Sequence, residues 1–286
     1  MTQARDPYGA ALESVLWSVP YNSATQYLNW YNKSEPDPRH GVACIYQTLY
    51  VAERATALGA PEARILQDLR HIAAVFETDG DVVVLDPYLL HLTPIRFPAD
   101  EVRRGHSSVE VDAAPVRLDG QGGEHPARLA AVYRSSDHGY RIRLRYSKYS
   151  VKKGSYFLSR HFTLRSENQF EYADFSADMS ALLTHPEQNS VSIRALVADT
   201  AVTAEAIIPL KNFAEREFSA ADIWLRSGQG VASRNDADAA AVWADLERAT
   251  GLECADIEEH LVSAAQIYQK IADHRTSLLD YSLQDV

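Results

Sequence analysis

A change in the spacing of hydrophobic residues near position 72 constrains this chain most. Upstream, Cys44 to Leu58 has apolar residues every three or four positions and is followed by Gly59, which predicts a helix that begins at or near Cys44. Downstream, the spacing is that of strands. The runs Ile72 to Glu77 and Val82 to Asp86 flank Asp79-Gly80, a dipeptide typical of a two-residue hairpin turn. The chain therefore combines helices with antiparallel strands.

The same two spacings extend along the rest of the chain. Further strand-like runs cover residues 129–134, 140–146, 155–164 and 190–197, and helical spacing returns at 237–249 and 256–271. Antiparallel strands joined by short turns favour a small barrel or sandwich. We expect an α+β protein with three domains, which are a helical domain at 1–65, an antiparallel β domain at 66–207 and a mostly helical domain at 208–286.

Charge and cysteine content exclude several classes of protein. The 286 residues include 28 basic and 39 acidic side chains, a formal net charge of −11, whereas general nucleic-acid binding needs a cationic surface. Two cysteines are too few for a disulfide framework and fit a reducing compartment. No segment reads as a secretory signal or approaches the roughly 18 apolar residues of a membrane-spanning helix. We expect a cytoplasmic protein that binds neither nucleic acid nor membrane.

Three residues form a candidate catalytic triad, namely Cys44, His71 and Asp86. A cysteine attacks as its thiolate, which a helix N-terminus and a nearby imidazole favour, and a carboxylate orients the imidazole. If Asp79-Gly80 is a two-residue turn, Asp86 faces Ala73, and His71 lies two residues away on the same face. That diagonal leaves the Cβ atoms about 7–8 Å apart, a distance that the two side chains bridge.

Simpler interpretations of these residues stay open. A three-residue turn would put His71 and Asp86 on opposite faces of the hairpin. A lone cysteine at a helix start is more often a small buried residue, and an aspartate before a proline commonly ends a strand. Against this, the sequence contains no HExxH, CxxC, P-loop or GxSxG motif and no convincing metal-ligand spacing. The triad is therefore our hypothesis, and we expect no metal site.

Three motifs carry a resemblance to a known family. Cys44 opens its helix after a glycine-containing loop, His71 precedes Asp86 by fifteen residues across the hairpin, and Ala173 to Pro186 contains an Asp-Phe pair and ends in Thr-His-Pro. In this order and separation, over about residues 15–210, the chain resembles the arylamine N-acetyltransferase family. That family has a transglutaminase-like, papain-related arrangement and uses a Cys-His-Asp triad.

The resemblance implies both a fold and an activity. The fold would be α+β, with an N-terminal helical bundle, a central antiparallel β-barrel and a mostly helical C-terminal lid. The activity would be acyl transfer from a thioester donor (coenzyme A or the pantetheine arm of an acyl carrier protein) through a Cys44 thioester to a small-molecule amine, forming an amide. His71 would be the base, and Asp86 would orient it. The resemblance implies no permanently bound cofactor, because the acyl thioester is a co-substrate.

Several residues around the thiol depart from the pattern of this family. The Arg-Gly-Gly-x-Cys motif reads His40-Gly-Val-Ala-Cys44, Tyr46 replaces an acidic residue, and Pro87-Tyr-Leu-Leu replaces a glycine-rich stretch. Because these changes alter the residues around the thiol, two alternatives to acyl transfer onto an amine stay open. One is a cysteine-dependent cyclase, amide synthase or thioester hydrolase in a biosynthetic pathway. The other is a non-catalytic binding protein that keeps the fold.

Donor phosphates would require a local cationic patch on this acidic chain. The candidate residues are Arg141, Arg143 and Arg145 with Lys148, Lys152 and Lys153. The arginines alternate strictly with apolar residues, which equally fits the solvated face of an amphipathic strand. The residues that bind the donor stay open at this point.

Overall fold

The computed structural model describes residues 6–177, 179–197, 200–234 and 237–283, and the chain divides into two compact units. One unit consists of Met1–Leu16 and Cys44–Phe170, and the other of Trp17–Ala43 and Glu171–Val286. The three consecutive domains that we expected do not coincide with this division. The difference arises because the helix that begins at Cys44 packs with the following strands rather than with the segment before it.

The first unit contains helices α1 (Pro7–Ser18, as far as Leu16), α3 (Cys44–Ala57) and α4 (Ala99–Arg103) and the short 3₁₀ helix η2 (Pro87–Leu89). Its strands are β2 (Arg64–Asp68), β3 (His71–Thr78), β4 (Asp81–Leu85), β5 (Ile95–Phe97), β6 (His106–Leu118), β7 (Glu124–Ser136), β8 (Gly139–Ser150) and β9 (Ser155–Arg165). They form two antiparallel sheets with strand orders β2-β3-β4-β5 and β6-β7-β8-β9.

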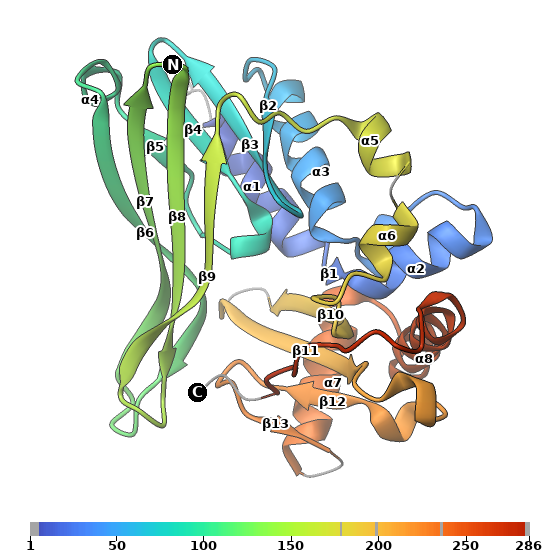
Figure 1. Cartoon of the computed structure of the whole chain (residues 1–286). Coiled ribbons are helices and arrows are strands. Elements are labelled where there is room, and N and C mark those ends of the chain that lie inside the picture. The colour runs from blue at the N-terminus through green and yellow to red at the C-terminus, as the bar shows by residue number, and fades with distance from the viewer. Residues whose placement is uncertain (1–5, 178, 198–199, 235–236, 284–286) are drawn as a thin grey trace. The chain divides into compact units, whose positions relative to one another are not determined.

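The sheet β2-β3-β4-β5 is the middle layer of this unit, with α1 and α3 on one side and the long strands β6 to β9 on the other (Figure 1). Ala73 and Val75 of β3 join an apolar cluster shared with the second sheet. On the opposite face, Phe76 packs edge-on against Tyr8 of α1, with ring centroids 5.1 Å apart. Because both faces are covered, β3 is apolar along nearly its whole length.

The hairpin β3-β4 has the register that the sequence predicts. Thr78 pairs with Asp81 and Ala74 with Leu85, so the residue after Leu85 lies opposite Ala73. The two turn residues, Asp79 and Gly80, have φ angles of 51° and 88°, as a two-residue turn of this hand requires. The predicted two-residue turn is confirmed.

The α+β class is confirmed, but the predicted closed β-barrel is wrong. The three antiparallel sheets stay separate within the described part of the chain. The two sheets of the first unit share a core, yet single bridges such as Leu66 to Gln169 and His91 to Ala113 take the place of a ladder between them. Closure requires continuous pairing between sheet edges, so these sheets pack face to face instead.

The second unit has one antiparallel sheet with strand order β1-β10-β11-β12-β13. Its strands are β1 (Tyr21–Asn22), β10 (Ser190–Val197), β11 (Val202–Pro209), β12 (Trp224–Arg226) and β13 (Ala232–Ser233). Its helices are α2 (Ser23–Asn32), α5 (Tyr172–Ala177), α6 (Met179–Leu183), α7 (Ala237–Thr250) and α8 (Cys254–Ile271), with 3₁₀ helices η1 (Pro38–His40), η3 (Phe213–Glu215) and η4 (Ala220–Asp222). The helices α7 and α8 pack against β10 and β11 around a common apolar core.

No helix among the described residues has the length and apolar character needed to span a bilayer.

Candidate active site

Cys44 is the first residue of α3, as predicted, and its half-buried thiol forms no disulfide. The first N–H groups of a helix have no partner within the helix, and the helix dipole is positive at this end. A thiolate at this position is therefore favoured by its own helix. This effect is modest, so a second charged group is needed to hold the sulfur ionised.

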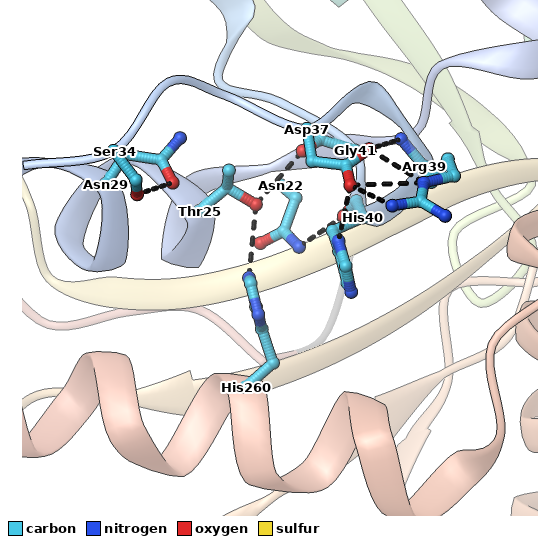
Figure 2. A network of polar contacts seen from close by, with 9 residues as sticks. All are labelled: Asn22, Thr25, Asn29, Ser34, Asp37, Arg39, His40, Gly41 and His260. Carbon is cyan, nitrogen blue, oxygen red and sulfur yellow. Dashed lines mark hydrogen bonds and ion pairs between the residues drawn. The ribbon is translucent and has the colours of Figure 1, made fainter. Parts of the chain in front are cut away.

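The loop before Cys44 is fixed by hydrogen bonds within the second unit, which Figure 2 shows from close by. The side chain of Asn22 donates to the carbonyl of His40 (2.6 Å), and Thr25 Oγ1 donates to the carbonyl of Gly41 (3.0 Å). Burial and the charge of His40 lower the pKa of His260 to about 4, so the neutral ring can donate its Nε2–H to Thr25 Oγ1 at 3.1 Å. Gly41 has a φ of 76°, and a Cβ there would lie 2.5 Å from a backbone oxygen.

His71 and Asp86 form a buried pair at the open end of the hairpin. His71 Nε2 lies 2.7 Å from Asp86 Oδ2, and the residues are 5% and 0% exposed. The second carboxylate oxygen, Oδ1, has no hydrogen-bond partner among the described residues. Since Asp86 directs one oxygen to the imidazole and is otherwise sealed from water, it is well placed to fix the orientation of His71 and to stabilise its cation.

Cys44 completes the triad. Its side chain is close enough to His71 to contribute to the raised pKa of the imidazole, whose Nε2 is engaged by Asp86. Burial opposes a charged imidazole, but the charge and hydrogen bond of Asp86, together with those of Cys44, outweigh it and raise the pKa of His71 to about 10. The structure thus brings together all three predicted residues, with an imidazolium between a carboxylate and a sulfur.

Two aromatic rings enclose the imidazole. Phe162 of β9 stacks on His71 with ring centroids 3.7 Å apart and planes 18° apart, and Tyr88 lies at a tilt with its centroid 5.5 Å away. The face of an aromatic ring attracts a cation, so Phe162 favours the charged imidazole while it shields the ring from solvent. Tyr88 belongs to η2, which follows Asp86 directly.

His91 is a further residue of the site that the sequence did not reveal. Its Nε2 accepts the backbone N–H of Asp86 at 2.9 Å, and its Nδ1 lies 2.7 Å from the carbonyl of Thr93. Burial lowers the pKa of His91, against smaller opposing effects of Thr93 and Asp86, which keeps the ring neutral and able to accept. No motif marks this residue, because both of its partners are backbone groups.

The arginines proposed to bind donor phosphates lie away from this triad. Arg141, Arg143 and Arg145 are exposed and alternate with the buried residues Ile142 and Leu144 along β8. They therefore lie on the outer face of their sheet, opposite the face that packs against the β2-β5 sheet. Of the two interpretations that the sequence left open, this placement fits the solvated face of an amphipathic strand.

The remaining cations are divided among other places. Lys148 lies 6.0 Å from the centre of the Tyr146 ring, and Lys152 and Lys153 lie in the exposed turn after β8. Arg160 of β9 is exposed on the same face as Phe162, and its Nε donates to the Tyr88 hydroxyl over a long 3.4 Å. Arg160 thus contacts Tyr88, one of the two rings that enclose the His71 imidazole.

Within the described part of the chain, no group of three or more His, Cys, Asp or Glu side chains has the geometry to hold a metal ion. Comparisons of the chain with models of protein families and with curated proteins find no match.

Proposed function

We propose that this chain is an arylamine N-acetyltransferase-like acyltransferase that moves an acyl group from a thioester to an amine through Cys44. The observation that carries the proposal is the buried His71–Asp86 pair beside the thiol at the start of α3. The resemblance in motif order supports the same reaction. A cation beside the sulfur is what a nucleophilic cysteine requires.

The first half-reaction transfers the acyl group to the enzyme. The Cys44 thiolate attacks the carbonyl carbon of the acyl thioester, which forms a new carbon–sulfur bond and a tetrahedral oxyanion. Backbone N–H groups at the start of α3 are suited to stabilise this oxyanion, and losing one such donor typically costs about 10²–10³ in rate. The donor sulfur then leaves and takes the proton from the His71 imidazolium, so Cys44 carries the acyl group and His71 is neutral.

The second half-reaction releases the product. The amine attacks the Cys44 thioester, and its proton passes to His71 as the new carbon–nitrogen bond forms. The tetrahedral intermediate collapses to an amide, and the Cys44 thiolate leaves beside the regenerated imidazolium. Asp86 stabilises the charge of His71 in both half-reactions. Ping-pong kinetics are expected.

Recognition of the donor would fall to the cation beside the triad. A phosphate on the pantetheine arm of coenzyme A or of a carrier protein needs a guanidinium or ammonium partner. Arg160 contacts Tyr88, whose ring packs against His71, whereas Arg141, Arg143 and Arg145 lie on the opposite face of the sheet. We therefore assign the donor phosphate to Arg160 in place of these three.

The proposal is tested by intact-mass analysis after mixing with a panel of acyl thioesters. The chain should gain the mass of one acyl group, Cys44→Ser should gain none, and Cys254→Ser is the matched control that should gain the same mass as the unchanged protein. With an amine present, an intermolecular amide identifies a transferase, a free acid identifies a hydrolase and a ring identifies a cyclase. No mass gain with any donor, together with slow alkylation of Cys44, would contradict the proposal and favour a binding protein.

A further inference from the structure

The outer face of the sheet β6-β7-β8-β9 concentrates positive charge that the triad does not use. Besides Arg128, which is 3.8 Å from Glu110 of the same face, five exposed arginines lie on three adjacent strands of this face, namely Arg134, Arg141, Arg143, Arg145 and Arg165. Arg134 pairs with Arg141 and Arg141 with Arg165, so three guanidinium groups occupy one cross-strand row. Like charges directly opposite one another destabilise a sheet, so this row is not explained by folding.

These arginines also differ from the arginines elsewhere on the surface. Arg39, Arg64 and Arg275 each form an ion pair with a carboxylate. Among the residues that the structure describes, none of the five on the outer face forms an ion pair, and Arg165 contacts a carbonyl of its own strand. The guanidinium groups of this face are therefore available to an anionic partner.

Positive charge is concentrated in this part of the sequence, whereas the net charge of the whole chain is negative. Residues 106–165, which supply both faces of this sheet, contain eleven basic and five acidic side chains, a formal charge of +6, whereas the whole chain has −11. A partner that this face attracts would be repelled by most of the remaining surface. Such a distribution favours one orientation of an acidic partner and raises its rate of association.

The spacing of the arginines fits an acidic helix. Adjacent strands lie about 4.8 Å apart, and alternate residues of one strand about 6.7 Å apart. Carboxylates one turn apart on an α-helix repeat about every 5.4 Å, so a helix with Glu or Asp on one side can meet several guanidinium groups at once. The other outward residues in these rows of β7, β8 and β9 are Ala130, Val132, Thr163 and His161, so within these described rows one imidazole is the single ring that could stack on a nucleic-acid base.

The cationic face and the ring that covers His71 share one strand, β9. Phe162, which stacks on His71, lies between His161 and Thr163 in β9. Those two neighbours pair with Arg145 and Arg143 and share the outer face with them. A protein bound to this face would therefore lie against the strand that covers the catalytic imidazole.

We infer that the outer face of β7, β8 and β9 docks an acidic, helical acyl carrier protein that delivers the acyl thioester. This inference rests on the proposed function, because it assigns the source of the donor. The protein partner is recognised through carboxylates on a helix, and the row Arg134, Arg141 and Arg165 is the main contact.

The direct test is the affinity of an acyl carrier protein bearing 4′-phosphopantetheine for the unchanged chain and for the variant Arg134→Gln/Arg141→Gln/Arg165→Gln. We expect at least a tenfold loss of affinity in the variant and a weaker dependence on salt. Arg39→Gln/Arg275→Gln removes two exposed but ion-paired arginines and is the matched control, which should bind as the unchanged chain does. Because the substitutions remove repulsion, the triple variant should melt no lower than the unchanged chain.

Three results would overturn the inference. They are no binding of the carrier by the unchanged chain, equal binding by the triple variant, and tighter arginine-dependent binding of a single-stranded oligonucleotide than of the carrier. A second measurement separates this inference from the proposed function. Acylation of Cys44 by free S-acetyl-pantetheine should be the same in the unchanged chain and the triple variant, whereas acylation by the acetylated carrier should fall about tenfold in the variant. Arginine-dependent binding without acylation by either donor would contradict the proposed function alone.

Discussion

Two helices of this chain begin with a free, half-buried cysteine, yet their surroundings differ in charge. Cys44 starts α3 beside His71, whose ring is held by Asp86. Cys254 starts α8 beside two carboxylates instead. Its backbone N–H donates to Glu247 at 2.8 Å, and burial together with the charges of Glu258 and Glu247 raises the pKa of its thiol.

The comparison separates the effect of a helix N-terminus on a thiol from the effect of the neighbouring side chain. Both sulfur atoms experience the positive end of a helix dipole, an effect worth less than about 1 kcal/mol at exposed positions. The adjacent side chain decides the outcome, because an imidazolium favours the thiolate and a carboxylate opposes it. Cys254 therefore serves as an internal reference for every measurement on Cys44.

The largest expected effect comes from removing the ring that distinguishes the two cysteines. In His71→Ala, the rate of Cys44 alkylation by iodoacetamide at pH 6 should fall by about 10²-fold, because the thiol then ionises like an ordinary one. Cys254 in the same molecule should keep its rate. Peptide mass spectrometry measures both rates in one sample, and an unchanged Cys44 rate would refute a role for His71 in activating the sulfur.

His71→Ala should also lower the free energy of unfolding. A second His–Asp pair provides a reference for the size of this loss. His71 and Asp86 are buried, with side chains 6% and 0% exposed, whereas the His125–Asp119 pair is on the surface at 29% and 28%. His71→Ala leaves a buried carboxylate without its partner, so unfolding free energy should fall by about 3–5 kcal/mol. His125→Ala should cost much less, because water screens that surface pair. Urea denaturation measures both, and equal losses would mean that burial of the His71–Asp86 pair is unimportant for stability.

The raised pKa of His71 makes stability depend on pH. A histidine in the unfolded chain releases its proton near pH 6.5, whereas the folded chain holds the proton of His71 up to about pH 10. The folded state thus binds the extra proton between these values, so this contribution is complete below pH 6.5 and is lost as pH rises toward 10. Urea midpoints at pH 6, 8 and 10 should fall more steeply in the unchanged chain than in His71→Ala, and parallel curves would contradict this origin.

His91 should have a smaller effect. His91→Ala removes the acceptor of the Asp86 N–H, and leaving that buried donor unpaired should cost about 1–3 kcal/mol of stability. His91→Gln restores an acceptor and should recover part of the loss. If His91 positions the carboxylate, His91→Ala should also shift the pH profile of Cys44 alkylation, and a stability loss with an unchanged profile would reduce His91 to a structural role.

The smallest effect concerns the arginine row. Arg141→Thr removes a guanidinium opposed on both sides by Arg134 and Arg165, so the unfolding free energy should rise by about 0.2–1 kcal/mol. Arg275 is paired with Asp273 on the surface, and Arg275→Thr should give no gain. Thermal melting of the two variants measures both effects. A lower melting temperature for Arg141→Thr would show that the arginine row stabilises the fold.

The sequence predicted the parts of the site that depend on local pattern. Asp79-Gly80 set the hairpin register and with it the alignment of His71 with Asp86, and the apolar spacing after Cys44 placed the start of α3. Strand β6 was missed because His106–Leu118 mixes polar residues, a proline and a bulge, which weakens its alternation. Whether the sheets join depends on pairing between edge strands that lie far apart in sequence. No local sequence pattern indicates that pairing. His91 was missed because it binds backbone atoms only.

The central claim is that His71 activates the sulfur of Cys44 as a nucleophile under conditions where Cys254 is not activated. The pH dependence of iodoacetamide alkylation at both cysteines of the unchanged protein, followed from pH 4 to pH 9 in one sample, tests it most directly. Cys44 should react about 10²-fold faster than Cys254 at pH 6. Two superimposable curves that rise together only above pH 8 would contradict the claim.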